Sequence, residues 1–342
     1  MHIFEQIAQI AALIQSEKRK KCASARIQLI HIDVLNYLST ANQYTDTPAA
    51  TAAYFGMTRG TVSQSLILLE KKGYIEKNQD KIDKRIIHVK LLPPGQAILN
   101  KVRNNALYTK ATKLFNRKMN GESYRDVFIN ALIALQKASQ SRTFTTFHSK
   151  KTDIMNKNSV FDVIELMAAL IRSEERKKCT ELKLQMVHFQ VLEYLSQCNK
   201  YSDKPAAIAN YLGITRGTVS QTLIILEKRE FLEKIQDEHD KRVYHIRLLE
   251  KGIETLKKAK PQELYEKANE ILQRESSHAD RQEVFTEALT ALQKANESYT
   301  FGVCKTCRNF SVTGNGYFCL LTRENLTESD SEKICQEHQP SE

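Results

Sequence analysis

The sequence has no long apolar run, and its first residues lack the basic and apolar segments of a secretory signal. A helix that crosses a membrane needs about 20 consecutive apolar residues, so we expect no membrane span. The missing signal pattern predicts a cytoplasmic protein. The C-x-x-C pair at Cys304 and Cys307 does not stand in the βαβ pattern typical of dithiol redox enzymes, so we expect no enzyme of that class.

What the sequence does have is length and an excess of positive charge. Its 342 residues are enough for two or three domains with cores of their own. It contains 51 Lys and Arg against 40 Asp and Glu, a formal net charge of +11. Because the segment after residue 301 is rich in acidic side chains, the basic excess lies before it. A basic surface favours polyanionic partners, and nucleic acid is the first of these.

One stretch of the sequence occurs twice. Residues 58–71 are T-R-G-T-V-S-Q-S-L-I-L-L-E-K, and residues 215–228 are T-R-G-T-V-S-Q-T-L-I-I-L-E-K. The same offset of 157 residues carries Phe4 to Phe161 and Phe144 to Phe301, without an insertion. Repeats of domain size indicate a tandem duplication, since solenoid repeats are much shorter. The predicted segments are repeats over 1–141 and 158–301, a polar connector over 142–157, and a cysteine-rich module over 302–342.

Within each repeat, the spacing of apolar residues predicts mainly helices and one small hairpin. Pro48 suits the first turn of a helix, where its missing N–H would be unpaired anyway. Gly56 permits a tight turn, Thr58 is a preferred helix cap, and residues 93–95 close the hairpin. The elements expected in the first repeat are helices over 3–21, 27–38, 49–55 and 58–71, strands over 74–77 and 85–91, and long helices over 96–119 and 124–139.

The segment from Pro48 to Leu69 has the parts of a helix-turn-helix: a short supporting helix, a tight turn and a second helix that can enter the major groove. Arginine can bond guanine or clamp phosphate, glutamine can bond adenine, and the hydroxyls of Ser and Thr can do either. The residues expected at DNA are Thr58, Arg59, Thr61, Ser63 and Gln64 in the first repeat, and Thr215, Arg216, Thr218, Ser220 and Gln221 in the second.

The charged hairpin after this helix predicts a basic wing. An arginine at its tip fits the narrow minor groove, where the negative potential is enhanced. Asp83 and Asp240 are expected to hold the neighbouring arginines by ion pairs rather than to touch DNA. The wing residues expected at DNA are Lys81, Lys84 and Arg85 in the first repeat, and Lys241 and Arg242 in the second.

This order of helices, wing and long helices resembles the MarR (multiple antibiotic resistance regulator) family. The similarity includes T-R-G-T-V-S at 58–63, L-L-E-K-K-G-Y-I at 68–75, and D-K-R at 83–85 followed by L-L-P-P-G at 91–95. It implies winged helix-turn-helix domains that dimerise through their first and last helices on pseudo-palindromic DNA. With two copies in one chain, it implies a monomer that acts as a pseudo-dimer, with further oligomerisation left open. The usual family member has one such domain and no cysteine-rich tail.

Two cysteines and two pairs of histidines are further candidates for a site. Cys22 and Cys179 each follow two lysines, and positive charge lowers a thiol pKa. Some members of the family sense peroxide through a cysteine near this place, so both are candidate redox thiols; the competing interpretation is a half-buried structural residue. The pairs His31/His188 and His88/His245 are interpreted as packed or surface histidines rather than ligands.

Cys304, Cys307, Cys319 and Cys335 predict a metal site. A C-x-x-C loop brings two thiolates onto one ion. A segment of this size cannot bury enough surface to fold alone, so a bound metal would stabilise it. Four thiolates suit zinc or an iron–sulfur cluster. The segment loosely resembles small modules that hold a 4Fe–4S cluster, which we favour, whereas His338 in place of one thiolate would favour zinc.

The sequence therefore predicts a mainly α fold with small β-wings, in which tandem winged helix-turn-helix domains form an intramolecular pseudo-dimer and carry a cysteine-rich metal-binding tail. We expect a non-enzymatic, sequence-specific transcriptional regulator of double-stranded DNA that responds to redox state, oxygen, iron or nitric oxide through the tail. The alternative is a MarR-like regulator that senses a small ligand or thiol oxidation and has a purely structural zinc. Two competing hypotheses are a winged helix that binds protein instead of DNA and an architectural DNA-binding protein without a regulatory role.

Overall fold

The computed structural model describes residues 3–41, 43–55, 57–103, 109, 112–113, 115–119, 122–139, 160–237, 240–275, 283–289, 292, 301–314 and 316–339. The predicted connector over 142–157 and the turn residue Gly56 lie outside these ranges. None of the described helices combines the length and apolar character needed to cross a membrane. The chain divides into two compact units: unit 1 is Met1–Glu174 with Gln262–Ala295, and unit 2 is Glu175–Pro261 with Asn296–Glu342.

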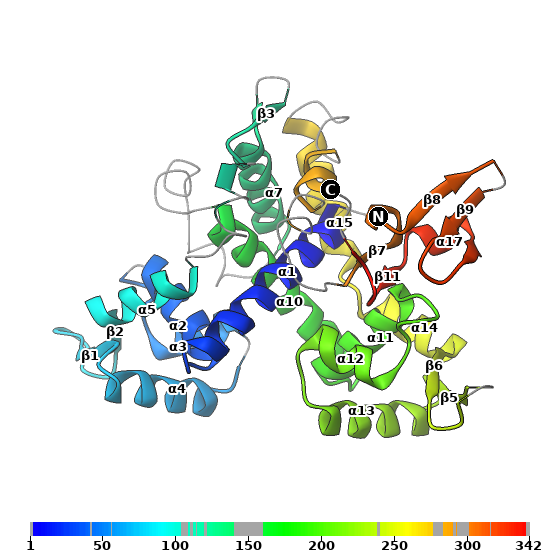
Figure 1. The fold of residues 1–342 in the computed structure, drawn as a ribbon. Coiled ribbons are helices and arrows are strands. Elements are labelled where there is room, and N and C mark those ends of the chain that lie inside the picture. The colour runs from blue at the N-terminus through cyan, green and yellow to red at the C-terminus, as the bar shows by residue number, and fades with distance from the viewer. Residues whose placement is uncertain are drawn as a thin grey trace. The chain divides into compact units, whose positions relative to one another are not determined.

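The first repeat lies entirely in unit 1 and is mainly helical (Figure 1). Its wing is an antiparallel pair of strands in which Ile75 faces Leu91 and Gln79 faces Ile87. The elements are α1 (Ile3–Ser24), α2 (Leu29–Thr40), α3 (Pro48–Phe55), α4 (Arg59–Lys71), β1 (Ile75–Gln79), β2 (Ile87–Leu91), α5 (Pro93–Arg103), β3 (Lys118–Met119), β4 (Glu122–Ser123) and α7 (Tyr124–Ala138).

The second repeat has the same order of helices and wing strands. Its wing keeps the register of the first, with Leu232 opposite Leu248 and Gln236 opposite Tyr244. Its first helix crosses from unit 1 into unit 2, and its last described helices return to unit 1. The elements are α10 (Val160–Glu181), α11 (Met186–Gln197), α12 (Pro205–Leu212), α13 (Arg216–Lys228), β5 (Leu232–Gln236), β6 (Tyr244–Leu248), α14 (Glu250–Ala259) and α15 (Gln262–Glu275), followed by a helix over 283–289.

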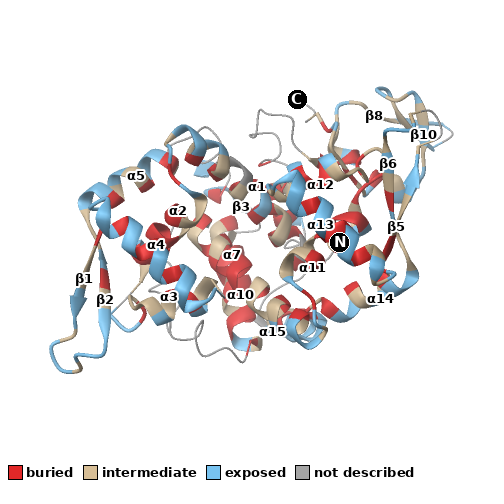
Figure 2. Cartoon of the chain, turned by 90° about the horizontal axis from the view of Figure 1, so that it is seen from below, coloured by how far each residue is buried: buried red, intermediate tan, exposed pale blue. Residues whose placement is uncertain are grey.

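The recognition helix of the first repeat is fixed by its cap and by its buried face. Thr58 Oγ1 accepts a hydrogen bond from the Thr61 N–H at 3.2 Å, as predicted. Val62, Leu66 and Leu69 are at most 1% exposed. Figure 2 shows how buried and exposed positions alternate along α4 and α13. A cap of this type is typically worth about 1 kcal/mol, and burial of three aliphatic side chains is worth several times more, so packing decides the orientation of the exposed face.

The core of unit 1 contains residues of both repeats. The apolar stripe of α7 packs against α15. Phe128 of α7 lies 4.5 Å from Phe285 between ring centroids, and Phe4 of α1 stacks on Tyr265 of α15 at 5.3 Å. The first and last helices of the first repeat are therefore packed with segments of the second.

A buried group of charges accompanies this core. The side chain of Lys18, which the sequence places in a basic run, is 1% exposed. Its Nζ lies 3.2 Å from Asp33 Oδ1 and forms an ion pair with Glu165 of α10. Asn36 Nδ2 donates to Glu165 Oε2 at 2.6 Å. Burial raises the pKa of Glu165, and Lys18 opposes this shift, so the two side chains depend on each other.

Two predictions about the end of the first repeat are wrong. Pro93 begins α5 instead of closing the hairpin, and Gly95 packs in the first turn of that helix. A Cβ on Gly95 would lie 2.3 Å from the carbonyl oxygen of Tyr74, so the close approach of wing and helix requires glycine. The long helix predicted over 96–119 does not reach Met119, because Lys118 and Met119 in β3 pair with Ser123 and Glu122 in β4.

The C-terminal segment of unit 2, residues 302–339, is called the cysteine module. It contains an antiparallel sheet in the order β10-β9-β8 and a second pair formed by β11 and β7. The module is built almost entirely from short elements: β7 (Gly302–Val303), a 3-10 turn η1 (Cys304–Thr306), β8 (Phe310–Thr313), β9 (Gly316–Cys319), β10 (Glu324–Leu326), α17 (Glu328–Ser331) and β11 (Ile334–Cys335).

Candidate functional sites: two helix–wing heads and a cysteine cavity

Each recognition helix and the wing behind it present one exposed polar face, which we call a head. The first head is α4 with β1–β2, and the second is α13 with β5–β6. Every residue that the sequence predicts at DNA is exposed on these elements. They are Thr58, Arg59, Thr61, Ser63, Gln64, Lys81, Lys84 and Arg85 in the first head, and Thr215, Arg216, Thr218, Ser220, Gln221, Lys241 and Arg242 in the second.

The wing arginines are held by their aspartates, as predicted. Arg85 Nε and Nη2 donate to the two carboxylate oxygens of Asp83 at 3.0 and 2.9 Å. Arg242 makes the same bidentate contact with Asp240 at 3.1 and 3.2 Å. Both arginine side chains remain 90% exposed. The pair therefore orients the guanidinium without removing it from solvent, and Arg85 lowers the pKa of Asp83.

A histidine bridges two carboxylates at the base of each wing. His88 Nδ1 lies 2.6 Å from Asp46 and its Nε2 lies 3.2 Å from Asp80. In the second head, His245 lies 2.6 Å from Asp203 and 3.0 Å from Asp237. The hydrogen bonds to these carboxylates raise the pKa of both histidines. The bridges tie each wing to the loop before its supporting helix.

Sequence reasoning missed Ile82 at the tip of the first wing. The residue is 96% exposed. The turn is fixed by Asp80 Oδ1, which accepts from the N–H groups of Ile82 and Asp83 at 2.7 and 2.8 Å. An apolar residue in an otherwise polar turn was the available signal, since apolar side chains are used as wedges in minor grooves.

The four cysteines of the module line one cavity of about 280 Å³. One wall of the cavity comes from the second repeat, through the loop over residues 198–204, which we call the docking loop. Asn199, Tyr201 and Lys204 line the cavity from this loop. Across the described residues, no three Cys, His, Asp or Glu side chains are drawn together closely enough to hold a metal ion as they stand. The thiols surround a space rather than converge on a point.

The thiols differ in their surroundings. Hydrogen bonds from Cys304 and the side chain of Asn199 lower the pKa of Cys335 to about 6, whereas the contact with Cys335 and burial raise the pKa of Cys304. The N–H of Gln339 points at Cys307 Sγ from 3.4 Å. Donors of this kind stabilise thiolates, so the cavity has the donor set expected of a soft-metal site.

One polar atom indicates that the cavity is built for an occupant. Asn309 lines it, and in the described part of the chain Asn309 Nδ2 is buried without a hydrogen-bond partner. Buried polar groups normally have partners. A bound group or ordered water in the cavity would supply them.

His338 is not placed as a ligand, contrary to one option raised from the sequence. It is fully buried, its Nε2 lies 2.9 Å from Thr306 Oγ1, and it is absent from the cavity lining. A Cβ on Gly302 would lie 2.4 Å from its ring. The histidine fills the space behind β7, so the four cysteines remain as the candidate ligands.

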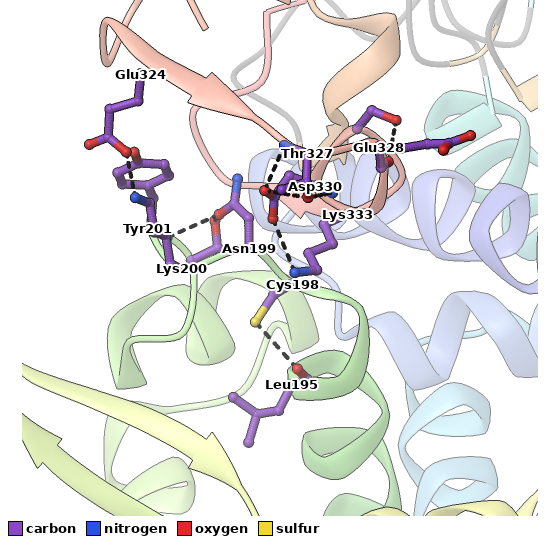
Figure 3. Close-up of polar contacts among 12 residues, drawn as sticks. Leu195, Cys198, Asn199, Lys200, Tyr201, Glu324, Thr327, Glu328, Asp330 and Lys333 are labelled. Carbon is purple, nitrogen blue, oxygen red and sulfur yellow. Dashed lines mark hydrogen bonds and ion pairs between the residues drawn. The ribbon is translucent and has the colours of Figure 1, made fainter. Parts of the chain in front are cut away.

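The docking loop is joined to the module by backbone and side-chain hydrogen bonds. The N–H of Asn199 donates to the carbonyl of Ile334 at 2.9 Å, and the N–H of Gln336 donates to Ser202 Oγ at 2.9 Å. Lys200 forms an exposed ion pair with Glu324 (Figure 3). Cys198, to which the sequence assigned no role, is buried in this contact and forms a β-bridge with Ile334.

Of the two interpretations of Cys22 and Cys179, candidate redox thiols or structural residues, the surroundings favour the structural one. The two residues are 3% and 1% exposed. Burial raises the pKa of each to about 11, and at Cys22 the lowering effect of Lys18 is the smallest of three contributions. Reactive cysteines need the opposite environment, which leaves the structural interpretation.

Comparison with known proteins finds one family that matches both helix-turn-helix segments. Residues 27–86 and 182–243 match the MarR family. No curated protein matches the chain. Similar solved structures include a mutant of S. aureus MepR bound to an oligodeoxyribonucleotide, at 20% identity and a TM-score of 0.28 over 40% of this chain and 99% of that one.

Two further similar structures are a MarR transcriptional regulator from Methanosarcina mazei Go1 and the transcriptional regulator Tm0710 from Thermotoga maritima. The first has 22% identity and a TM-score of 0.27 over 33% of this chain and 79% of that one. The second has 19% identity and a TM-score of 0.28 over 38% and 89%. The two MarR-matching segments end at corresponding residues of the two repeats, and each spans a helix-turn-helix with the first strand of its wing. The chain therefore carries two MarR-like copies in tandem.

Proposed function

We propose that this chain is a non-enzymatic transcriptional regulator that binds double-stranded DNA with both heads. The observation that carries the proposal is that α4 and α13 expose the same arginine, hydroxyl and glutamine side chains, beside wings that keep the same Asp–Arg pair. Such side chains supply both the phosphate contacts that give affinity and the base contacts that give specificity. The MarR match of both segments supports this function.

We further propose that one chain acts as a pseudo-dimer on a pseudo-palindromic operator. Support comes from the core of unit 1, where α1 and α7 pack with segments of the second repeat. The buried charges favour packing of a first repeat against a second repeat over packing of two second repeats. The counterpart of Lys18 in the second repeat is Glu175, and the counterpart of Glu165 in the first is Ala8. Pairing two second repeats would set Glu175 against Glu165, whereas first with second joins Lys18 to Glu165.

A DNA-binding experiment tests these two proposals. An operator is selected from random-sequence duplexes with the full chain, and the binding stoichiometry is measured together with the salt dependence. One chain should bind one inverted repeat whose half-sites lie about one helical turn apart. The double substitution Arg59→Ala with Arg216→Ala should abolish specific binding, while Lys267→Ala on α15 should not change it. Full affinity in the double variant would refute the assignment of the heads.

For the cysteine cavity we propose an iron–sulfur cluster held by Cys304, Cys307, Cys319 and Cys335, through which the regulator responds to redox state, oxygen, iron or nitric oxide. The support is that all four cysteines line one cavity, and four thiolates suit an iron–sulfur cluster. Zinc with a purely structural role is the alternative. Anaerobic purification with an absorption spectrum and iron and sulfide analysis distinguishes them: a colourless protein with one zinc per chain would exclude the cluster.

A further inference from the structure

The cysteine cavity is completed by the second repeat. We propose that the group bound in this cavity controls the DNA affinity of the second head alone. This inference rests on the proposed function, because it needs a group in the cavity and DNA at the heads. The docking loop then positions the metal site, and the metal site in turn positions the second wing.

The cysteine cavity and the second repeat share a wall. Asn199 and Tyr201 line the cavity, and the side chain of Asn199 hydrogen-bonds Cys335. The strand that carries Cys335 is fixed to the same loop through the Asn199–Ile334 and Gln336–Ser202 hydrogen bonds, each 2.9 Å long. A ligand that draws Cys335 toward the other thiols must therefore move the docking loop. If the loop stays in place, it opposes the movement of Cys335.

Hydrogen bonds connect the docking loop to the wing. Asp203 follows Ser202 directly, and its carbonyl accepts from the N–H of Ile246 in β6 at 2.9 Å. Its carboxylate holds His245, which in turn holds Asp237 at the start of the wing turn, with distances of 2.6 and 3.0 Å. The loop, the histidine and the wing are thus connected by hydrogen bonds without a gap.

The first repeat provides the comparison. The bridge Asp46–His88–Asp80 is the same there, and the N–H of Val89 donates to the Asp46 carbonyl at 2.8 Å. The counterpart of Tyr201 is Tyr44, which is 78% exposed. The hydrogen bonds that connect the loop to the wing are therefore present in both copies. Among the described residues, only the docking loop of the second copy forms a wall of the cysteine cavity.

Thermodynamic linkage requires that the occupant and DNA affect each other's binding equally. If the occupied cavity favours the DNA-bound position of the second wing, DNA must raise the affinity of the cavity for its occupant by the same factor. Coupling of this kind is typically about 5- to 150-fold. We expect removal of the metal to weaken binding through the second head at least about fivefold, and to leave binding through the first head within about twofold.

The experiment separates the heads with full-length variants. Arg59→Ala leaves binding to depend on the second head, and Arg216→Ala leaves it to depend on the first. The affinity of each for the selected operator is measured before and after the metal is stripped with EDTA and ferricyanide, and again after reconstitution with ferrous iron and sulfide or with Zn²⁺. Only Arg59→Ala should lose affinity on stripping. Equal responses of the two variants, or none, would overturn the inference.

A matched pair of substitutions tests the route. Ser202→Ala removes the acceptor of the Gln336 N–H and should make the Arg59→Ala protein insensitive to stripping while metal is still bound. Thr45→Ala, at the corresponding position of the first repeat, should leave the sensitivity unchanged. Metal content is measured on every sample. A protein that takes up neither iron nor zinc refutes the proposed cofactor and this inference together, whereas bound metal with equal responses refutes the inference alone.

Discussion

The two copies have the same contacts on the exposed face of the recognition helix and wing. They differ in the contacts that each copy makes with the rest of the chain. The capped helix, the Asp–Arg pair and the histidine bridge occur in both heads with distances that differ by 0.3 Å or less. In the loop before the supporting helix, Tyr44 of the first copy is 78% exposed, whereas its counterpart in the second copy, Tyr201, belongs to the docking loop and lines the cysteine cavity. The comparison indicates that the face proposed to bind DNA was kept while its supports became specialised.

The turn after the recognition helix shows the same divergence in the backbone. Gly73 has φ of 69° in the first copy, and its counterpart Glu230 has φ of 59° in the second. A side chain in this left-handed region costs roughly 1–2 kcal/mol. The Glu230 carboxylate is paired with Lys251 at 2.8 Å, and Arg229 donates to the carbonyl of Lys183 at 3.0 Å. These contacts offset part of the strain in the second copy.

The largest effect should come from giving the first copy the second copy's buried charge. Lys18→Glu places a third carboxylate beside Asp33 and Glu165, and breaking a buried pair typically costs about 3–5 kcal/mol. Urea unfolding of the full chain should show this loss. Lys20→Glu, on the exposed side of the same helix, should change stability by less than about 0.5 kcal/mol. Similar values for both variants would mean that the buried ion pair does not select unlike copies.

The next effect concerns the heads themselves. Arg59→Ala and Arg216→Ala should each weaken operator binding by about 1–3 kcal/mol, the usual range for one bidentate contact with a base. Fluorescence anisotropy at fixed salt measures both. Matching losses would mean that the two heads contribute equally, and a loss in one variant only would assign specific binding to a single head.

Exchanging the turn residues tests the backbone difference. Glu230→Gly should stabilise unit 2 by up to about 1 kcal/mol through relief of strain, less the lost contact with Lys251, and Gly73→Glu should destabilise unit 1 by a similar amount. Hydrogen exchange of amides in α13 and α4 reports the two changes separately. Stabilisation by both substitutions would contradict the strain argument.

The smallest effect should be the pH dependence of the wings. The folded pKa of His88 and His245 is raised above the ordinary value of 6.5, so the bridges contribute fully below that value and are lost as pH rises through the raised pKa. Because these side chains are partly exposed and solvent screens their ion pairs, we expect well under 1 kcal/mol from each. Operator affinity measured between neutral and alkaline pH should fall, and His88→Gln with His245→Gln should flatten the profile. A rise in affinity with pH would contradict the assignment.

Sequence patterns predicted the features that depend on neighbouring residues or on the helical period. Thr58 as a cap, Pro48 at a helix start and the inner face of α4 follow from short-range rules, and the structure confirms them. The buried position of Lys18 could not be predicted, because its partner Glu165 lies in the other repeat. The docking of Gln336 on Ser202 joins residues 134 positions apart, and no periodicity records it. The cysteines were identified by type and spacing, but their shared wall with the second repeat was not.

The cysteine module, placed on one head, gives the bound complex a direction along the DNA. A dimer of identical subunits on a palindrome looks the same from either end of its site. This chain, bound as proposed, would present the first head at one half-site and the second head, with the cysteine module, at the other. Reversing the operator relative to a promoter would then exchange which face meets the transcription machinery, so operator orientation becomes part of the regulatory information.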